Sequence, residues 1–108
     1  MKYVKQNAWN ELKKELFENR PVCKLCKVKP AVHLHHCIVS KGQVRNRKFH
    51  KHLNVIENAL EVCSDCHVGA DAYNVRLMAW QIQCQRYGRE RINDWYDNLP
   101  FKVKEAYE

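Results

Sequence analysis

The chain has 108 residues, with 19 Lys and Arg against 12 Asp and Glu, which gives a formal net charge of +7. This length predicts one domain over residues 1–108 with a small hydrophobic core. The charge favours a polyanionic partner such as nucleic acid, although a basic surface that serves only solubility gives the same value. The sequence has no apolar leader and no run of about 18 apolar residues, so we expect a cytoplasmic protein without a membrane span.

The N-terminal part, residues 1–22, is predicted to be a helix. Asn7 can cap it, and we expect it to end near Asn19, before Pro21. Apolar residues recur at helical spacing over this stretch, which indicates a face that packs on the core. They are Ala8, Trp9, Leu12, Leu16 and Phe17.

The middle of the chain predicts a β-hairpin. Residues 31–39 are β-branched and apolar apart from three histidines, and residues 53–62 give the second strand. Strict alternation along a strand places His35 and His36 on opposite faces. If both serve one metal site, the strand must bulge or end there.

Residues 40–52, between the predicted strands, are basic and offer few apolar groups for burial. We therefore expect a mobile, positively charged loop that contacts a phosphate backbone, and the alternative is a solvated run of charge. The candidate phosphate contacts are Lys41, Arg45, Arg47, Lys48 and Lys51.

The C-terminal part, residues 76–108, predicts two helices. A long amphipathic helix is expected to end at Gly88, and a shorter helix is expected to stop at Pro100. The long helix carries apolar residues at steps of four and three, and the short helix has an apolar side. These positions are Tyr73, Leu77, Trp80, Cys84 and Tyr87, then Ile92, Trp95, Tyr96 and Leu99.

Two Cys-x-x-Cys pairs, Cys23 with Cys26 and Cys63 with Cys66, predict a structural zinc site. The two-residue gap lets both thiolates of a pair reach one ion, and four thiolates complete a tetrahedral shell. Disulfides are the alternative, but they belong to exported chains. The remaining cysteines are expected to pack as small apolar groups: Cys37 and Cys84.

The combination of His35-His36, then Asn58, then Cys63-x-x-Cys66-His67 resembles the HNH endonuclease motif, with the asparagine five residues before the first cysteine. The match covers about residues 23–75. It implies an α+β fold of the ββα-metal (His-Me finger) type, in which a hairpin and a helix hold one divalent cation. A four-cysteine zinc site would cross-link and stabilise this core, and the N- and C-terminal helices would flank it.

The resemblance also implies roles for single residues. His36 corresponds to the general base that takes a proton from the attacking water. His35 and His67 correspond to ligands of the catalytic metal, and Asp71, four residues further along the helix, stands where many members have another ligand. Asn58 corresponds to the asparagine that orients the loop and the base through hydrogen bonds.

These residue types suit phosphodiester hydrolysis without reference to any family. A neutral imidazole can deprotonate water at cellular pH, and a divalent cation can neutralise charge on the phosphate and the leaving oxygen. Mg²⁺ and Mn²⁺ are the expected catalytic cations. Imidazole ligands also suit Ni²⁺, Co²⁺ or Zn²⁺, so the histidines do not identify which cation acts in catalysis.

The sequence therefore predicts a metal-dependent HNH endonuclease that acts on DNA, with double-stranded DNA as the expected substrate. The alternative is a zinc-stabilised nucleic-acid-binding module without activity, and an RNA-directed nuclease is a third possibility. Short proteins of this type resemble phage nucleases, some of which assist the packaging terminase. We accordingly expect a phage or bacterial protein with terminase as a partner, either a monomer or a homodimer.

Overall fold

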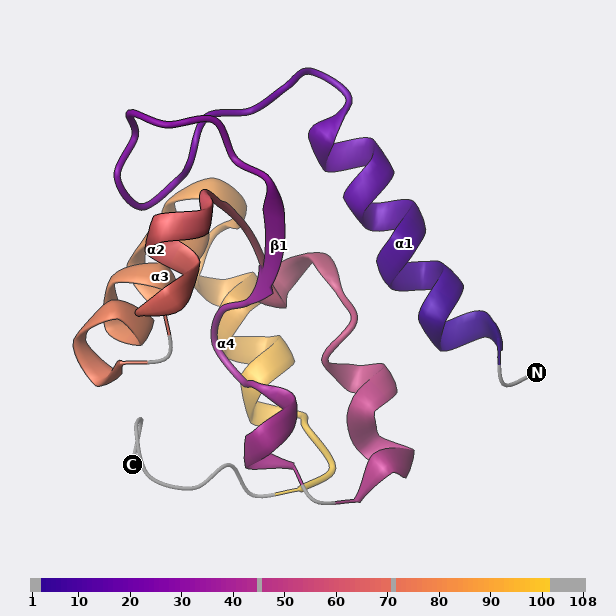
Figure 1. Ribbon diagram of the computed structural model, residues 1–108. Coiled ribbons are helices and arrows are strands. Elements are labelled where there is room, and N and C mark those ends of the chain that lie inside the picture. Colours follow the sequence, from indigo (N-terminus) through magenta and orange to yellow (C-terminus); the bar gives the residue numbers. More distant parts are fainter. Residues whose placement is uncertain (1–2, 45, 71, 102–108) are drawn as a thin grey trace.

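Helices surround a small two-stranded sheet in a mixed α+β arrangement (Figure 1). The computed structural model describes residues 3–44, 46–70 and 72–101, with no account of side chains for residues 3–7. The strands are β1 (His33–His36) and β2 (Ala59–Val62). The α-helices are α1 (Tyr3–Phe17), α2 (Ser64–Val68), α3 (Tyr73–Tyr87) and α4 (Arg89–Asp97), and the 3-10 helices are η1 (Lys41–Gln43), η2 (Arg47–His52) and η3 (Ile56–Asn58).

The antiparallel hairpin of β1 and β2 is shorter than the predicted strands over 31–39 and 53–62. Its register pairs His33 with Val62 and His36 with Ala59. The Cys37 N–H still donates to the Asn58 carbonyl at 3.0 Å, but the pairing stops there because the N–H groups of Ile38 and Val39 donate to the Asn58 side chain instead of a partner strand. The predicted second strand is likewise replaced by η3 over its middle residues.

Residues 40–52 were predicted to be a mobile, positively charged loop, and the expectation of a loop is wrong in that the segment contains η1 and η2. Local side chains close these short helices: Asn46 Oδ1 accepts a hydrogen bond from the Lys48 N–H at 3.0 Å, and His50 Nε2 donates to the Val44 carbonyl at 2.8 Å. The Trp95 indole N–H in α4 donates to the carbonyl of His52 at 3.1 Å. The segment is thus folded and attached to the C-terminal helices.

The predicted helices are confirmed, with changes at their ends. Helix α1 begins at Tyr3, so Asn7 lies within it and is not its N-cap. Helix α3 ends at Gly88 as predicted, and Gly88 has a φ of 99°, a value that favours glycine. Helix α4 ends at Asp97, before Pro100. None of the described helices is long and apolar enough to cross a membrane.

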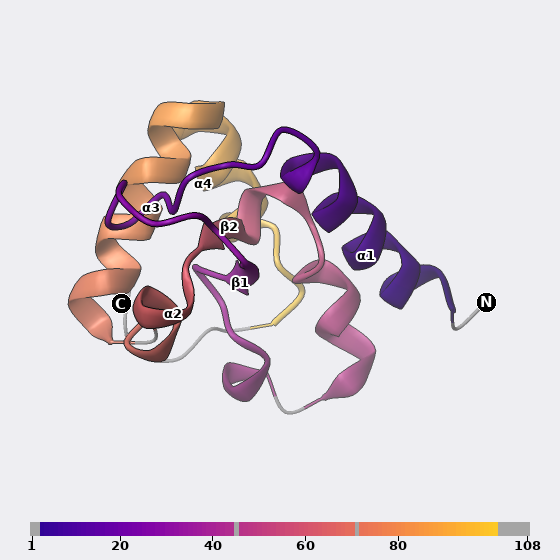
Figure 2. The same cartoon turned by 45° about the horizontal axis from the view of Figure 1, so that its top comes forward.

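The hydrophobic core lies between the hairpin and the two C-terminal helices. All four residues of β2 are buried, and Leu60 and Val62 are fully so. Cys37 and Cys84 also belong to this core, as expected, and burial raises the pKa of Cys37 to about 12. Helix α1 lies on the opposite side of β1 from α3, as two views show (Figures 1 and 2).

Buried polar groups tie α3 to the hairpin. The Gln83 side chain is fully buried, and its Nε2 donates to the carbonyls of Ile56, Glu57 and Ala59 at 2.9–3.1 Å. Arg86 forms a two-pronged ion pair with the buried Glu61, at 2.9 and 3.1 Å. These bonds fix where α3 crosses the strand. A shift of the helix would leave the buried carbonyls and the Glu61 carboxylate without their hydrogen-bond donors.

We predict that Gln83→Ala lowers the free energy of unfolding by about 2–4 kcal/mol, because it leaves carbonyls without a donor and opens a cavity. Gln85→Ala, at an exposed position of the same helix, is the matched control and should change stability by about 0.5 kcal/mol or less. Urea unfolding at constant metal concentration measures both. Equal stabilities for the two variants would contradict the role of Gln83.

Candidate functional site

Four cysteine sulfurs gather at one end of the hairpin. The Sγ atoms of Cys23, Cys26, Cys63 and Cys66 all lie within 4.8 Å of one another, and those of Cys26 and Cys63 are 3.9 Å apart. A tetrahedral ion with Zn–S bonds of about 2.3 Å needs sulfurs about 3.8 Å apart. The donor set and spacing therefore fit a metal ion such as zinc.

Backbone structure brings the two cysteine pairs together. The first pair lies in a turn that Lys27, with a φ of 61°, closes by donating its N–H to the Cys23 carbonyl at 2.9 Å. The second pair begins α2, where Cys63 is the N-cap and its sulfur accepts the Cys66 N–H at 3.4 Å. The Lys24 N–H donates to the Glu61 carbonyl at 2.9 Å, which attaches the first turn to β2.

The thiols of Cys23 and Cys66 differ in how readily they ionise. Burial raises the pKa of Cys23, but backbone N–H donors at Cys26, Cys63 and Leu25 outweigh it and hold that pKa at about 6. Burial and the neighbouring thiols raise the pKa of Cys66. Ionisation of one thiol thus makes ionisation of its neighbour less favourable. A bound dication would remove this penalty.

A cluster of imidazoles lies beside the second cysteine pair. The rings of His35 in β1 and His67 in α2 meet edge to face with centroids 5.2 Å apart. His33, two residues earlier on β1, stacks on His67 with centroids 4.7 Å apart. The structure therefore brings together the two histidines predicted as ligands, and it adds His33. Alternation along the strand could have identified His33, because it shares a face with His35.

The spacing of these rings fits a shared cation. Two imidazoles that bind one ion through metal–N bonds of about 2.1 Å have ring centres about 5 Å apart. His67 is exposed and His35 is buried, so an ion between them would keep access to solvent and to a substrate. In the parts of the chain that the structure describes, the four cysteines are the only group of three or more His, Cys, Asp or Glu side chains whose donor atoms all lie within 4.8 Å of one another, so the histidines do not form such a group. Asp71, the further predicted ligand, lies outside the described residues.

His36 does not join that cluster. The strand keeps a regular register up to His36, so alternation directs this side chain away from His35. Its ring stacks on Trp9 of α1 with centroids 3.9 Å apart and planes within 7°, and its Nε2 lies 2.9 Å from Asn54 Oδ1. The sequence assigns Trp9 to the core, and neither the stack on Trp9 nor the hydrogen bond with Asn54 leaves a signal in local sequence.

The environment of His36 favours the neutral ring. Burial disfavours the charged imidazolium and lowers the pKa of His36. The hydrogen bond with Asn54 acts in the opposite direction, and the nearby Lys41 and His50 lower the pKa further. A neutral imidazole retains a lone pair, which is what proton abstraction from water requires.

Asn58 organises the chain on both sides of the hairpin. Its side chain is fully buried, and Oδ1 accepts the N–H groups of Ile38 and Val39 at 2.8 and 2.9 Å. Its Nδ2 donates to the carbonyls of Val39 and Leu53 at 2.9 and 3.0 Å. Both lone pairs and both protons of the amide are thus used within the protein. Asn58 accordingly holds the backbone at residues 38 and 39 against the carbonyl of Leu53.

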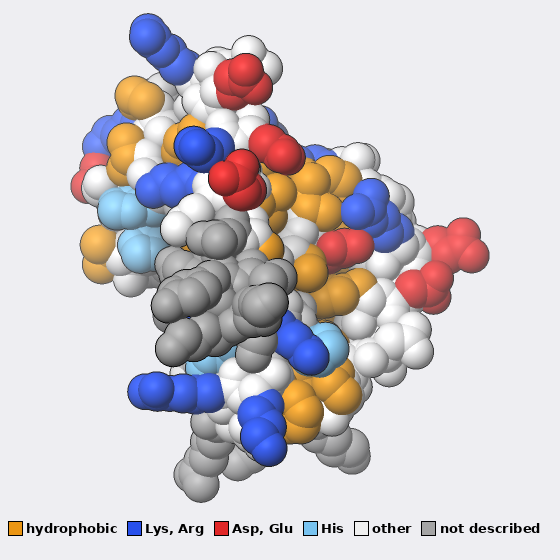
Figure 3. All heavy atoms as spheres, turned by 90° about the vertical axis from the view of Figure 1, so that its right-hand side faces the viewer, with side chains coloured by type: hydrophobic (Ala, Val, Ile, Leu, Met, Phe, Trp, Pro, Cys, Tyr) orange, Lys and Arg blue, Asp and Glu red, His pale blue; other side chains and the backbone are white. Residues whose placement is uncertain are grey.

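The predicted phosphate contacts described by the structure are exposed. Lys41 lies in η1, and Arg47, Lys48 and Lys51 lie in η2, whereas Arg45 falls outside the described residues. Residues 40–53 contain no Asp or Glu. Blue Lys and Arg spheres occupy the lower part of Figure 3, at the height where Figure 1 places these 3-10 helices.

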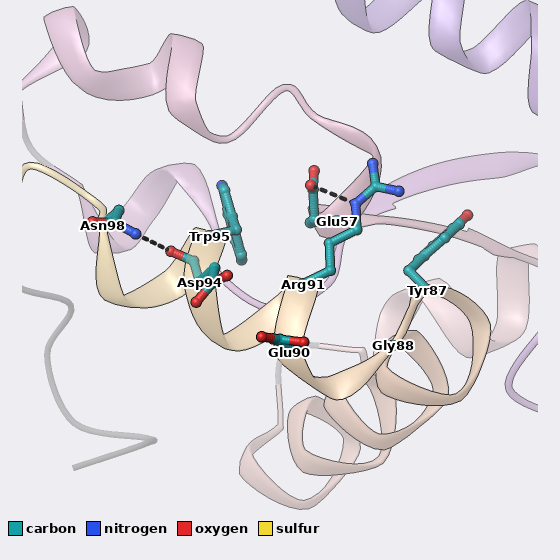
Figure 4. A pocket seen from close by; sticks show the side chains of 8 residues that line it. All are labelled: Glu57, Tyr87, Gly88, Glu90, Arg91, Asp94, Trp95 and Asn98. Atoms are coloured by element: carbon teal, nitrogen blue, oxygen red, sulfur yellow. Dashed lines mark hydrogen bonds and ion pairs between the residues drawn. The ribbon is translucent and has the colours of Figure 1, made fainter.

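A separate shallow hollow of about 710 Å³ lies against α4 (Figure 4). Glu57, Glu90 and Asp94 line it together with Arg91, which pairs with Glu57 at 3.0 Å. Its carboxylates outnumber its cations, so it would repel phosphate. We therefore do not count this hollow as part of a nucleic-acid-binding surface.

We predict that Cys23→Ser abolishes stoichiometric binding of the metal ion and unfolds the protein, because such sites couple on the order of 10 kcal/mol of binding free energy to folding. A strong chelator should unfold the unmodified protein in the same way. Cys84→Ala is the matched control, since it removes a thiol outside the cluster. Native mass spectrometry and circular dichroism give the readout, and a metal-free Cys23→Ser protein that stays folded would contradict the prediction.

Comparisons with protein-family models, with curated proteins and with solved structures find no match for this chain.

Proposed function

We propose that this protein is a metal-dependent endonuclease of the HNH type that hydrolyses phosphodiester bonds in DNA. The observation that carries the proposal is the contact of His35 with His67 at the junction of the hairpin and α2. The hairpin followed by a helix agrees with a ββα-metal fold. The buried Asn58, which holds the chain after His36, agrees with the central asparagine of the motif.

In this proposal two metals have separate tasks. Zinc binds the four cysteines and stabilises the fold. His35 and His67 would hold a second divalent cation, such as Mg²⁺, Mn²⁺ or Ni²⁺, which would supply charge neutralisation at the phosphate and the leaving oxygen. The imidazole donors favour the later transition metals over Mg²⁺.

His36 is the general base in this proposal. His35 and His36 are consecutive at the end of β1 and point to opposite sides of the strand. A phosphodiester that lies across this end of the strand could therefore contact both the cation at His35 and the ring of His36. The neutral ring of His36 accepts a proton from water, and the resulting hydroxide attacks phosphorus as the bond to the 3′ oxygen breaks. The products carry a 5′-phosphate and a 3′-hydroxyl, as the resemblance implies.

The basic 3-10 helices η1 and η2 would contact the DNA backbone. Lys41, Arg47, Lys48 and Lys51 are exposed, on a stretch without acidic residues. Contacts of this kind position a duplex without reading its sequence. The expected biological setting, a phage-infected bacterial cell with terminase as a partner, follows only from the resemblance.

A second candidate function is nucleic-acid binding without cleavage. The stacking of Trp9 on His36 favours it, because the indole covers one face of the ring at 3.9 Å. Both functions use the cysteine cluster and the basic surface. Only the nuclease needs an added divalent cation and His36.

We predict that His36→Ala retains the fold and DNA affinity but loses about 10²-fold or more of the cleavage rate, because the general base is missing. Plasmid nicking with EDTA, Mg²⁺, Mn²⁺ or Ni²⁺ measures this. The control is His50→Gln, which keeps an N–H donor for the Val44 carbonyl. Nicking by His36→Ala at the unmodified rate would refute the base, and binding without cleavage by the unmodified protein would favour the second function.

We predict that replacing Arg47 and Lys48 with Gln weakens DNA binding. The slope of log Kd against log salt concentration should fall by about 1 to 2. Each lost phosphate contact removes about 0.9 from that slope. A matched double variant at the exposed Lys27 and Arg89 should keep the slope. Fluorescence anisotropy at several salt concentrations gives the measurement, and equal slopes for the two double variants would exclude η2 as a phosphate contact.

A further inference from the structure

The hydrogen bond between His36 and Asn54 determines which ring nitrogen carries a proton. The atom of Asn54 that lies 2.9 Å from His36 Nε2 is the carbonyl oxygen Oδ1. A carbonyl oxygen only accepts, so Nε2 must be the donor. A neutral imidazole has a single N–H, and Nδ1 therefore carries the lone pair.

The stack on Trp9 and the bond to Asn54 restrict the ring in different ways. Parallel planes 3.9 Å apart hold the plane of the imidazole against the indole. Turning the ring over by 180° preserves that plane, so stacking alone does not choose between the two orientations. The Asn54 bond chooses, because only one orientation presents Nε2 to the carbonyl oxygen.

The backbone around Asn54 is itself anchored. Leu53 is fully buried, its N–H donates to the His50 carbonyl at 3.0 Å, and its own carbonyl accepts from Asn58 Nδ2. The Asn58 N–H donates to the carbonyl of Val55 at 3.0 Å. Asn54 is thus held between two residues that are tied to neighbouring segments, which is what a precise hydrogen bond to a ring requires.

We propose that Asn54 is a positioning residue that holds His36 with its proton on Nε2, so that Nδ1 is the atom that accepts the proton from water. This inference rests on the proposed nuclease function. In the step, a water O–H bond breaks, its proton binds Nδ1, and the hydroxide oxygen bonds to phosphorus. The bond from phosphorus to the 3′ oxygen breaks, and a solvent proton completes the 3′-hydroxyl. The imidazolium keeps its Nε2–H bond to Asn54 throughout.

Two substitutions separate the acceptor from the shape of the side chain. Asn54→Leu has a similar volume and no acceptor, whereas Asn54→Asp keeps an oxygen that can accept from Nε2. Asn98→Leu, at an exposed position in the turn after α4, is the control. Unfolding midpoints check that each zinc-loaded variant is folded.

The first readout is nuclear magnetic resonance of the ¹⁵N-labelled imidazoles, without DNA. We expect an Nε2–H signal for His36, protected from exchange, in the unmodified protein and in Asn54→Asp, and its loss in Asn54→Leu. The second readout is steady-state cleavage. We expect kcat to fall about tenfold or more in Asn54→Leu, with KM changed less than about twofold, and to recover in Asn54→Asp.

An Nδ1–H signal in the unmodified protein would overturn the inference, as would an unchanged kcat in Asn54→Leu. Loss of kcat in Asn54→Asp to the level of Asn54→Leu would also count against it. If the protected Nε2–H appears and depends on Asn54 but the unmodified protein cuts no DNA, then the positioning of the ring stands and the proposed nuclease function fails.

Discussion

The convergence of four cysteine sulfurs is the constraint on which the rest of the structure depends. It joins the turn at residues 23–26 to the start of α2, immediately after β2. His67 follows the last of these cysteines, so the cluster also sets where this imidazole meets β1. A two-stranded sheet is marginal in water by itself. A metal ion that neutralises the thiolates would supply the missing stabilisation and would position the candidate site through the same backbone.

Buried polar side chains then specify how the chain leaves the hairpin. Asn58 binds the backbone after β1, and Gln83 binds the backbone before and at the start of β2. A slip in register would leave these amides and carbonyls without partners in the interior, which is costly. The hairpin is therefore short but defined, and its end presents His35 and His36 to opposite sides.

Local patterns predicted the parts of this structure that depend on local chemistry. The Cys-x-x-Cys spacing indicated the sulfur cluster, and Gly88 marked the end of α3 because the chain needs a positive φ there. Strand lengths and the basic segment were predicted less well, since side-chain hydrogen bonds across the fold replaced ladder bonds and closed 3-10 helices. The partner of His36, Trp9, comes from a distant helix, and no local pattern reports such a contact.

The central claim is that a divalent cation separate from the zinc binds His35 and His67. Crystals of the zinc-loaded protein soaked in Mn²⁺ test it most directly, with anomalous difference maps recorded at the zinc and manganese edges. The account predicts a zinc peak among the four sulfurs and a manganese peak in contact with both imidazoles. Manganese bound elsewhere, or absent from these imidazoles at a concentration that supports cleavage, would contradict it.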